Sequence, residues 1–257
     1  MDQSWVDDYL ERIRAPRPEP PTADALRSLH AAHLLAVPFE NLSIHMGEPI
    51  RLDRQALLDK LLTRRRGGFC YELNGGFALL LDALGFAVTL LAARVFAGDN
   101  LGPPFDHLVL QVDTPEPWLT DVGFGKHSLY PLRLDDRRPQ PDPDGLFTIT
   151  ETAHGDIDVV SDGRPQYRIE RRSRVIGDFE PMCWWHQTSP KSHFTRSLTC
   201  SLRTATGRVT LSDRRLIRTT NGKRHETELI EDAEVLAAYK ACFGIVLDRV
   251  PRLKRDG

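Results

Sequence analysis

Hydrophobic residues in this chain follow helical spacing up to about residue 85 and alternate from about residue 88, and this change dictates the order of elements that the fold must contain. Helices are expected in the first part, at Met1–Arg14, Leu26–Leu34, Asp53–Leu62 and Cys70–Leu84. Strands are expected in the second part, at Val88–Val95, His107–Asp113, Trp118–Val122, Leu146–Glu151, Ile157–Val160 and Tyr167–Glu170, with strand signals continuing to about Met182. More strands follow, at Thr199–Arg203, Arg208–Leu211, Leu216–Thr219 and Lys223–Glu228, and a helix at Asp232–Phe243 closes the chain.

One cysteine lies where the last helix of the first part begins. Gly67 and Gly68 interrupt the apolar pattern, and Cys70 falls in the first turn of the segment that resumes it. Unpaired N–H groups and the macrodipole at a helix start favour negative charge, so the pKa of a thiol there is expected to fall below its usual value of about 8.5. The glycines leave one approach to the sulfur free of side chains. Cys70 is therefore a candidate nucleophile, although a buried helix cysteine also serves as a small core residue.

A histidine and an aspartate complete a possible catalytic set. His107 opens one expected strand, Asp121 lies at the end of the next, and the short turn Thr114–Pro117 joins them. The two strands form a hairpin in this interpretation, which places both side chains at its open end. A thiol facing such a pair has the nucleophile, base and orienting group of a covalent catalyst. His107 would withdraw the thiol proton, and Asp121 would fix the tautomer of the imidazole.

Several segments of the chain, in order, resemble the arylamine N-acetyltransferase family. They are Val37–Leu42, which contains P-F-E-N-L, Arg66–Asn74 (R-G-G-x-C-x-E-x-N), Asp106-His107, Asp121–Gly125 (D-V-G-F-G) and Ser189–Phe194 (S-P-x-S-x-F). Residues 222–247, including Phe243-Gly244-Ile245, also look familial. Each piece alone is weak, but five in order around a workable triad are a specific signature.

The resemblance implies an α+β fold with an N-terminal helical bundle, a central β-barrel and a C-terminal α/β lid around a thiol-protease-like Cys-His-Asp core. It implies a helical domain at 1–86 with the cysteine, a barrel domain at 87–188 with the histidine and aspartate, and a lid at 189–257. The implied activity is ping-pong transfer of an acetyl group from acetyl-coenzyme A to an arylamine, arylhydrazine or N-hydroxyarylamine through acetyl-Cys70, a reaction of xenobiotic metabolism. The tail after Ile245 is short, which weakens the family as a guide to donor and acceptor preference.

Substrate contacts are expected in the same segments. Arylamines are flat and apolar, so aromatic side chains should wall their site. The candidates are Phe39, Phe124 and Phe194, each of which would otherwise be an ordinary core residue. Gly125 and Lys126 are candidates for the border of the coenzyme channel, and the Cys70 N–H is the candidate oxyanion donor.

Polar neighbours of the triad are assigned supporting roles. An ion pair of Glu72 with Arg66 is expected to hold the start of the cysteine helix, and Glu40 and Asn41 are expected to satisfy nearby backbone groups. Core or surface roles are expected for the remaining candidates, His45, His127, His186, His193, Cys183, Cys200 and Cys242.

Other functions use similar residues. A thiol hydrolase or peptidase also needs Cys, His and Asp, but the surroundings of Cys70 lack papain-like signatures. An amide synthase that closes a macrolactam from a carrier-bound acyl chain would use the same triad. A binding protein without catalysis would have been favoured by loss of a triad residue, and none is lost.

Composition limits the partners. With 34 basic and 36 acidic residues the net charge is −2, which predicts no nucleic-acid partner. The four cysteines form no C-x-x-C pair, so no metal site is expected. No signal peptide is recognised, and the apolar stretch Phe77–Ala93 is broken by Asp82 and Gly85, so no membrane span is expected. A reducing cytoplasm is the expected location, since it would keep the thiol free.

Overall fold

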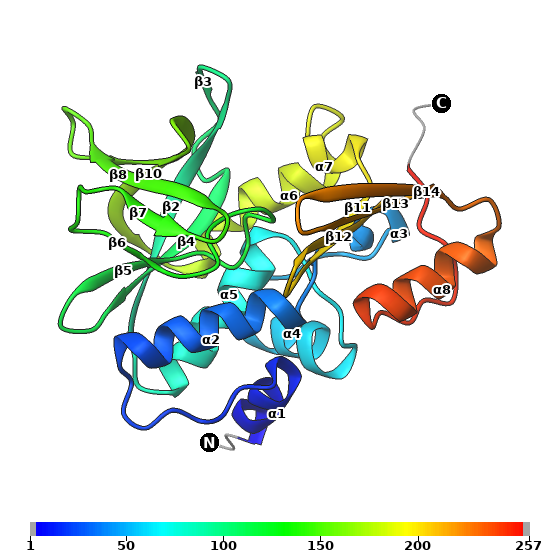
Figure 1. Cartoon of the computed structure of the whole chain (residues 1–257), viewed down its shortest axis with the longest axis horizontal. Coiled ribbons are helices and arrows are strands. Elements are labelled where there is room, and N and C mark those ends of the chain that lie inside the picture. The colour runs from blue at the N-terminus through cyan, green and yellow to red at the C-terminus, as the bar shows by residue number, and fades with distance from the viewer. Residues whose placement is uncertain (1–3, 254–257) are drawn as a thin grey trace.

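The structure is a computed structural model that describes residues 4–253, so Met1–Gln3 of the first expected helix and the last residues of the expected lid, 254–257, lie outside the described residues. The fold is α+β: helices gather at the N-terminal end, a large curled sheet lies to one side, and a smaller sheet with the last helix lies to the other (Figure 1). Within the described residues, no helix combines the length and apolarity needed to cross a membrane.

The N-terminal helices form around one helix that carries the cysteine. They are α1 (Ser4–Ile13), α2 (Ala23–Ala36), α3 (Leu42–Met46), α4 (Arg54–Leu58), the π-helical turn η1 (Asp59–Thr63) and α5 (Cys70–Ala83). The side chains of Thr22 and Asp53 cap α2 and α4 by accepting main-chain N–H groups, which explains where those helices begin. The helix expected at 53–62 is present as α4 followed by the π-helical turn η1. Helix α3 was not expected.

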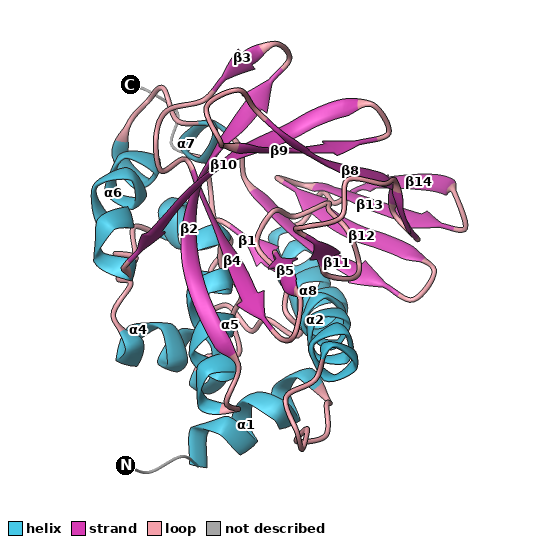
Figure 2. Cartoon of the chain, turned by 90° about the vertical axis from the view of Figure 1, so that its left-hand side faces the viewer, coloured by secondary structure: helices cyan, strands magenta, loops and turns pink. Residues whose placement is uncertain are grey.

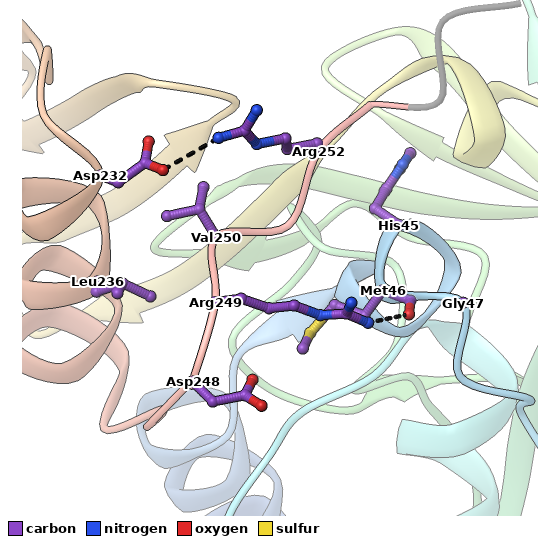
Figure 3. Close-up of a pocket in the computed structure, with 9 residues that line it drawn as sticks. All are labelled: His45, Met46, Gly47, Asp232, Leu236, Asp248, Arg249, Val250 and Arg252. Carbon is purple, nitrogen blue, oxygen red and sulfur yellow. Dashed lines mark hydrogen bonds and ion pairs between the residues drawn. The ribbon is translucent and has the colours of Figure 1, made fainter.

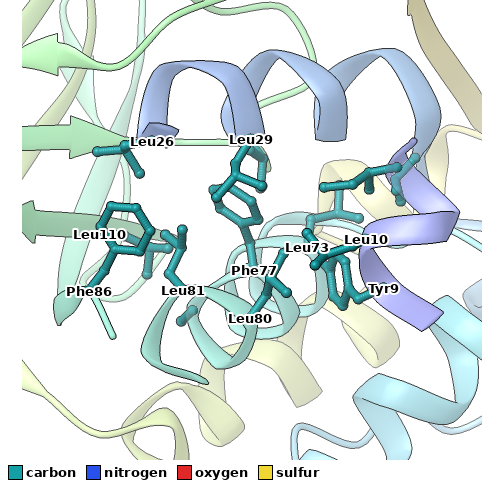
Figure 4. Packing of buried hydrophobic residues seen from close by; sticks show 14 of the residues in the cluster. Tyr9, Leu10, Leu26, Leu29, Leu73, Phe77, Leu80, Leu81, Phe86 and Leu110 are labelled. Atoms are coloured by element: carbon teal, nitrogen blue, oxygen red, sulfur yellow. The ribbon is translucent and has the colours of Figure 1, made fainter. Parts of the chain in front are cut away.

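The apolar faces of these helices share one core. Tyr9 and Leu10 of α1, Leu26 and Leu29 of α2, and Phe77 of α5 point into it (Figure 4). Leu110 and Val112, from the neighbouring sheet, complete the same cluster. The helix that bears Cys70 is therefore fixed against both the other helices and the sheet that bears His107.

The larger sheet is antiparallel and has nine strands in the order β6-β5-β4-β2-β10-β9-β8-β7, with β3 paired to β2 (Figure 2). The strands are β2 (Ala87–Ala97), β3 (Asn100–Leu101), β4 (His107–Asp113), β5 (Pro117–Thr120), β6 (Leu132–Arg133), β7 (Gln140–Asp142), β8 (Gly145–Glu151), β9 (Ile157–Ser161) and β10 (Arg164–Arg174). The sheet curls into a nearly closed barrel. Gln140 on β7 bridges the gap, since its side chain bonds to both the N–H (2.7 Å) and the carbonyl (2.9 Å) of Arg133 on β6.

The smaller sheet joins distant parts of the chain in the order β1-β11-β12-β13-β14. Its strands are β1 (Phe39–Glu40), β11 (Thr199–Thr204), β12 (Gly207–Ser212), β13 (Arg215–Thr220) and β14 (Lys223–Glu228), and α8 (Asp232–Phe243) packs against it. The N-terminal P-F-E-N-L segment therefore supplies the first strand of a sheet whose other strands lie near the C-terminus.

Two expected strand ends are wrong. The segment before residue 182 turns helical early, as η2 (Ile176–Phe179) and α6 (Glu180–Thr188), followed by α7 (His193–Arg196). Strand β5 stops at Thr120, so Asp121 begins the following loop instead of ending the strand. Apart from Gly145, which begins β8, the proline-rich stretch 137–145 forms only the edge strand β7, as expected for a segment in which Pro141 cannot donate a ladder bond.

Candidate active site

Helix α5 begins at Cys70 because Glu72, in its first turn, caps the main chain at the start of the helix. The Phe69 N–H donates to the Glu72 carboxylate (3.2 Å). A Cβ at Gly67 would overlap the Pro38 carbonyl, and a Cβ at Gly68 would lie 2.6 Å from a Glu72 oxygen. The two glycines therefore permit close packing at the helix start.

The Cys70 side chain is buried, and burial raises the pKa of its thiol well above the usual value. A main-chain hydrogen bond from Leu108 opposes that shift, but Asp106 and Asp121 reinforce it. The expectation that the helix start alone lowers the pKa of the thiol is wrong, because the sulfur is removed from water. A thiolate at Cys70 needs a base beside it to take the proton.

His107 and Asp121 form a buried pair, and the main chain of Leu108, the residue after His107, bonds to the Cys70 thiol. His107 Nε2 lies 2.8 Å from Asp121 Oδ2, and both residues are 2% exposed. Burial alone would raise the pKa of the Asp121 carboxyl, but the charge and hydrogen bond of His107 outweigh it and hold that pKa well below its usual range. The aspartate is therefore an anion positioned to stabilise a protonated His107. The expected hairpin of β4 and β5 is present, and it brings the two residues together.

The chain around Asp121 connects it closely to α5. Asn74 Nδ2 donates both to Asp121 Oδ1 (2.9 Å) and to the Leu108 carbonyl (2.6 Å), and its Oδ1 accepts the Val122 N–H (2.9 Å). The Gly123 N–H donates to Asp121 Oδ1 (2.9 Å). One asparagine on the cysteine helix thus joins strand β4 and the loop after β5 to that helix.

The sequence did not predict that His30 is a neighbour of Asp121. The Asp121 N–H points to His30 Nε2 on α2 (3.2 Å). The available signal was position, because His30 follows Leu26 by four residues and so shares the buried face of that helix.

The three candidate phenylalanines lie around this centre, each partly buried. The Phe124 ring lies 5.2 Å from that of His107, centroid to centroid, in an edge-on arrangement. The Phe39 and Phe194 rings lie 6.3 Å apart, and a Cβ at Gly125 would lie 3.7 Å from the Phe39 ring. Lys126 follows in the same loop and is exposed.

Two buried ion pairs support the helix start, and their partners differ from those expected. Glu72 pairs with Lys60 (2.5 Å) instead of Arg66, and Arg66 pairs with Glu40 (2.9 Å). Glu40 also accepts the Leu42 N–H (2.7 Å), in line with its expected backbone role. Lys60 was missed because it lies in a segment that looked like an ordinary amphipathic helix.

The other candidate histidines take different places. His127 is buried beside the Tyr167 ring, and burial lowers its pKa to about 4. His186 Nε2 lies 3.2 Å from Asp106 Oδ1 and its ring lies 5.0 Å from that of Phe194. His45 contacts the main chain at Phe194 and Ser197, and His193 is exposed. Cys183 and Cys200 are buried and Cys242 is half-buried, and all of the cysteines are free.

A pocket of about 620 Å³ lies away from this centre, between α3, α8 and the segment 248–252 (Figure 3). Arg252 reaches across it to Asp232 (3.1 Å), and Arg249 donates to the Met46 carbonyl (2.8 Å). None of its lining residues belongs to the candidate triad. Among residues 4–253, no group of three or more His, Cys, Asp or Glu side chains is arranged to hold a metal ion.

Comparisons with known proteins define the class of this chain. The N-acetyltransferase family profile matches residues 22–251. The arylamine N-acetyltransferase of Mycolicibacterium smegmatis is 36% identical, over 93% of this chain and 91% of that protein. The arylamine N-acetyltransferase / N-hydroxyarylamine O-acetyltransferase of Salmonella typhimurium is 34% identical, over 92% of this chain and 86% of that protein. The class is therefore that of the N-acetyltransferases.

A solved structure agrees with the sequence relatives. The arylamine N-acetyltransferase of Mycobacterium marinum in complex with CoA superimposes with a TM-score of 0.84, at 32% identity, over 93% of this chain and 92% of that one. The chain belongs to the arylamine N-acetyltransferase family, and it is an acyltransferase.

Proposed function

We propose that this enzyme transfers an acetyl group from acetyl-coenzyme A to arylamines, arylhydrazines or N-hydroxyarylamines by a ping-pong mechanism through acetyl-Cys70. The observation that carries the proposal is the buried His107–Asp121 pair, with 2.8 Å between Nε2 and Oδ2, together with a thiol at a helix start that bonds to the main chain of Leu108, the residue after His107. The CoA complex of the Mycobacterium marinum relative supports a coenzyme A thioester as the donor.

In the first half-reaction, His107 accepts the Cys70 proton on Nδ1, since its Nε2 faces Asp121. The sulfur attacks the thioester carbonyl carbon, and a tetrahedral intermediate forms. The bond from that carbon to the coenzyme sulfur then breaks, and the departing coenzyme thiolate takes the proton from His107. One thioester replaces another, so the acyl group is stored on Cys70 without a large change in free energy.

In the second half-reaction, the amine nitrogen attacks the carbonyl carbon of acetyl-Cys70. His107 accepts a proton from that nitrogen, the carbon–sulfur bond to Cys70 breaks, and the thiolate of Cys70 is regenerated beside the imidazolium. Asp121 stabilises the imidazolium in both halves and keeps Nδ1 turned to the sulfur. The Cys70 N–H, at the start of α5, is the proposed donor to the oxyanion.

Each of three segments contributes to the proposed site. In this proposal a helical domain up to residue 86 supplies the nucleophile, a barrel domain at 87–188 supplies the base and its orienting acid, and a lid domain from residue 189 onward carries Phe194. We assign the arylamine to the space beside Phe39, Phe124 and Phe194, because the Phe124 ring lies against His107 and the Phe39 and Phe194 rings lie against each other. Gly125 and Lys126, in the loop after Phe124, are the proposed border of the coenzyme channel.

The mechanism requires a reduced thiol, and this requirement favours a cytoplasmic location for the enzyme. It uses no metal, because a protonated histidine and main-chain donors supply the charge stabilisation that each step needs.

The test is the intact mass of the protein after mixing with acetyl-coenzyme A and no amine. We expect a gain of one acetyl group, its absence in Cys70→Ser, and its discharge when an arylamine such as anisidine is added. Rapid loss of the acetyl group to water without amine would indicate a hydrolase. No adduct on a demonstrably reduced thiol would contradict the proposed donor and favour a carrier-bound acyl chain, as in an amide synthase.

A further inference from the structure

We infer that His30 is a positioning residue for the acyl-transfer reaction: its imidazole joins the two ends of segment 121–129 and so holds Asp121 in place for His107. The inference rests on the proposed function, because Asp121 has a task only if the thiol and His107 act together.

His30 lies on α2 and is completely buried. One ring nitrogen, Nδ1, lies 2.8 Å from the Leu129 carbonyl oxygen. The other, Nε2, lies 3.2 Å from the Asp121 main-chain nitrogen. A single side chain from the helical bundle therefore reaches both ends of the loop that carries Phe124 and Gly125.

The two contacts define one protonation state of the ring. A carbonyl oxygen can only accept and a main-chain N–H can only donate, so Nδ1 carries the proton and Nε2 presents its lone pair. A doubly protonated ring would direct an N–H at the N–H of Asp121. Burial lowers the pKa of His30, which keeps the ring neutral in the form that both contacts require.

Few other hydrogen bonds fix the main chain of Asp121. Its side chain is fixed by Asn74 and by the Gly123 N–H, but strand β5 stops one residue earlier, at Thr120. Within residues 4–253 the Asp121 N–H consequently has no ladder partner on a neighbouring strand, and His30 supplies its acceptor. A shift of the Asp121 main chain would move the carboxylate relative to His107 Nε2.

His33 provides a matched comparison on the same helix. It is also completely buried, and its Nδ1 lies 3.2 Å from the Tyr9 hydroxyl. Both histidines pack edge-on against the ring of Phe77. His33 Nε2 has no hydrogen-bond partner among the described residues, and the His33 ring contacts Tyr9 and Phe77, which lie outside segment 121–129. A substitution at His33 therefore disturbs the same core without touching the loop.

The experiment measures the rate of Cys70 alkylation by iodoacetamide from pH 5 to 10, with the site of modification read by mass spectrometry. His30→Phe removes both contacts but keeps a planar ring, and it should slow alkylation near neutral pH by roughly tenfold to a hundredfold. His33→Phe should leave the profile unchanged at a comparable loss of Tm. An unchanged profile in His30→Phe, or an equal loss in His33→Phe, would overturn the inference.

Two further variants keep the test decisive if His30→Phe does not fold. His30→Gln places an acceptor near the former Nε2 position and should stay within about threefold of the wild type. His30→Asn places a polar group near Nδ1 only and should lose about as much as His30→Phe is expected to lose. A wild-type alkylation profile in His30→Asn would refute the positioning role.

Alkylation needs no acyl donor, so the inference and the proposed function fail separately. If the wild type is alkylated with a thiol–imidazole profile that His30→Phe disturbs, but acetyl-coenzyme A leaves no adduct, the proposed donor is wrong and the role of His30 stands. If the acetyl adduct forms and the alkylation profile of His30→Phe matches that of the wild type, the proposed donor is supported and the positioning role of His30 is wrong.

Discussion

Gly123 packs directly on the nucleophile: a Cβ at this position would lie 2.7 Å from the Cα of Cys70 and 2.7 Å from Nδ2 of Asn74. The backbone of the loop that follows Asp121 thus lies directly against the backbone of the first turn of α5 and beside the Asn74 side chain. This contact sets the distance between the thiol and the hairpin that carries its base, and only glycine allows it.

Gly123→Ala should therefore separate Cys70 from the His107–Asp121 pair. Adding a methyl group to this closely packed contact should destabilise the fold by about 1–3 kcal/mol and lower the acylation rate beyond what stability explains. The measurements are urea denaturation and single-turnover acetylation. Gly177→Ala is the control, because a Cβ there meets no atom of the described residues within 4 Å. Equal acetylation rates in both variants would refute the proposed spacing role.

Asp121→Asn should disable His107 while leaving the hairpin folded. The amide keeps an oxygen for the Gly123 and Asn74 donors but cannot stabilise an imidazolium, so kcat should fall by about 10³–10⁴-fold. Asp135→Asn, at an exposed aspartate paired with Arg133 (2.9 Å), serves as the control and should keep full activity. A near-normal rate in Asp121→Asn would remove this residue from the mechanism.

Lys60→Met should destabilise the start of the cysteine helix. Removing the ammonium leaves Glu72 buried without its 2.5 Å partner, which typically costs about 3–5 kcal/mol. Adding Glu72→Gln in the same chain should recover most of the loss, since no unpaired charge is then buried. Chemical denaturation of the single and double variants checks this, and a double variant no more stable than Lys60→Met would show that the pair does not act as a unit.

Stability should fall as the pH drops below about 6.5, because the unfolded chain then protonates histidines that the fold keeps neutral. Burial lowers the pKa of His127 to about 4. A folded pKa below the unfolded value contributes stability above about pH 6.5 that is lost between that pH and 4, about 3 kcal/mol for this residue. The difference in unfolding free energy between wild type and His127→Gln should shrink by that amount from pH 7 to 4. A difference that is constant over this range would show that His127 does not titrate as stated.

The sequence predicted the elements that carry the chemistry, because their signals are local. The bounds expected for His107–Asp113, Lys223–Glu228 and Asp232–Phe243 match β4, β14 and α8. A helix start at Cys70 and a hairpin that joins His107 to Asp121 follow from periodicity and turn residues alone. Elements that depend on tertiary contacts were missed. Strand β1 is one of them, because it is defined by its pairing with β11.

The site was predicted less fully than the fold. Neither Lys60 nor His30 looks unusual within its own helix, since a partner of a buried ion pair or of a main-chain N–H is defined by what lies opposite it in space. The pKa of the thiol was predicted in the wrong direction for the same reason. Helix position is readable from sequence, but the burial of Cys70, which raises the pKa of the thiol, depends on the packed neighbours.

Strand β1 also has a consequence for the order in which the molecule is assembled. The Thr199 N–H donates to Asn41 Oδ1 and the Asn41 N–H donates to the Thr199 carbonyl, across 158 residues of chain. The ribosome synthesises Asn41 long before Thr199. The neighbouring Glu40 N–H, in contrast, donates to the Gly68 carbonyl (2.9 Å), and Gly68 is synthesised soon after Glu40. In pulsed hydrogen exchange during refolding, we expect the Glu40 amide to gain protection with α5 and the Asn41 amide only with β11. The Cys70 thiol and His107 would then come together while part of the molecule is still unfolded. The rings of Phe39 and Phe194 would reach their final places last.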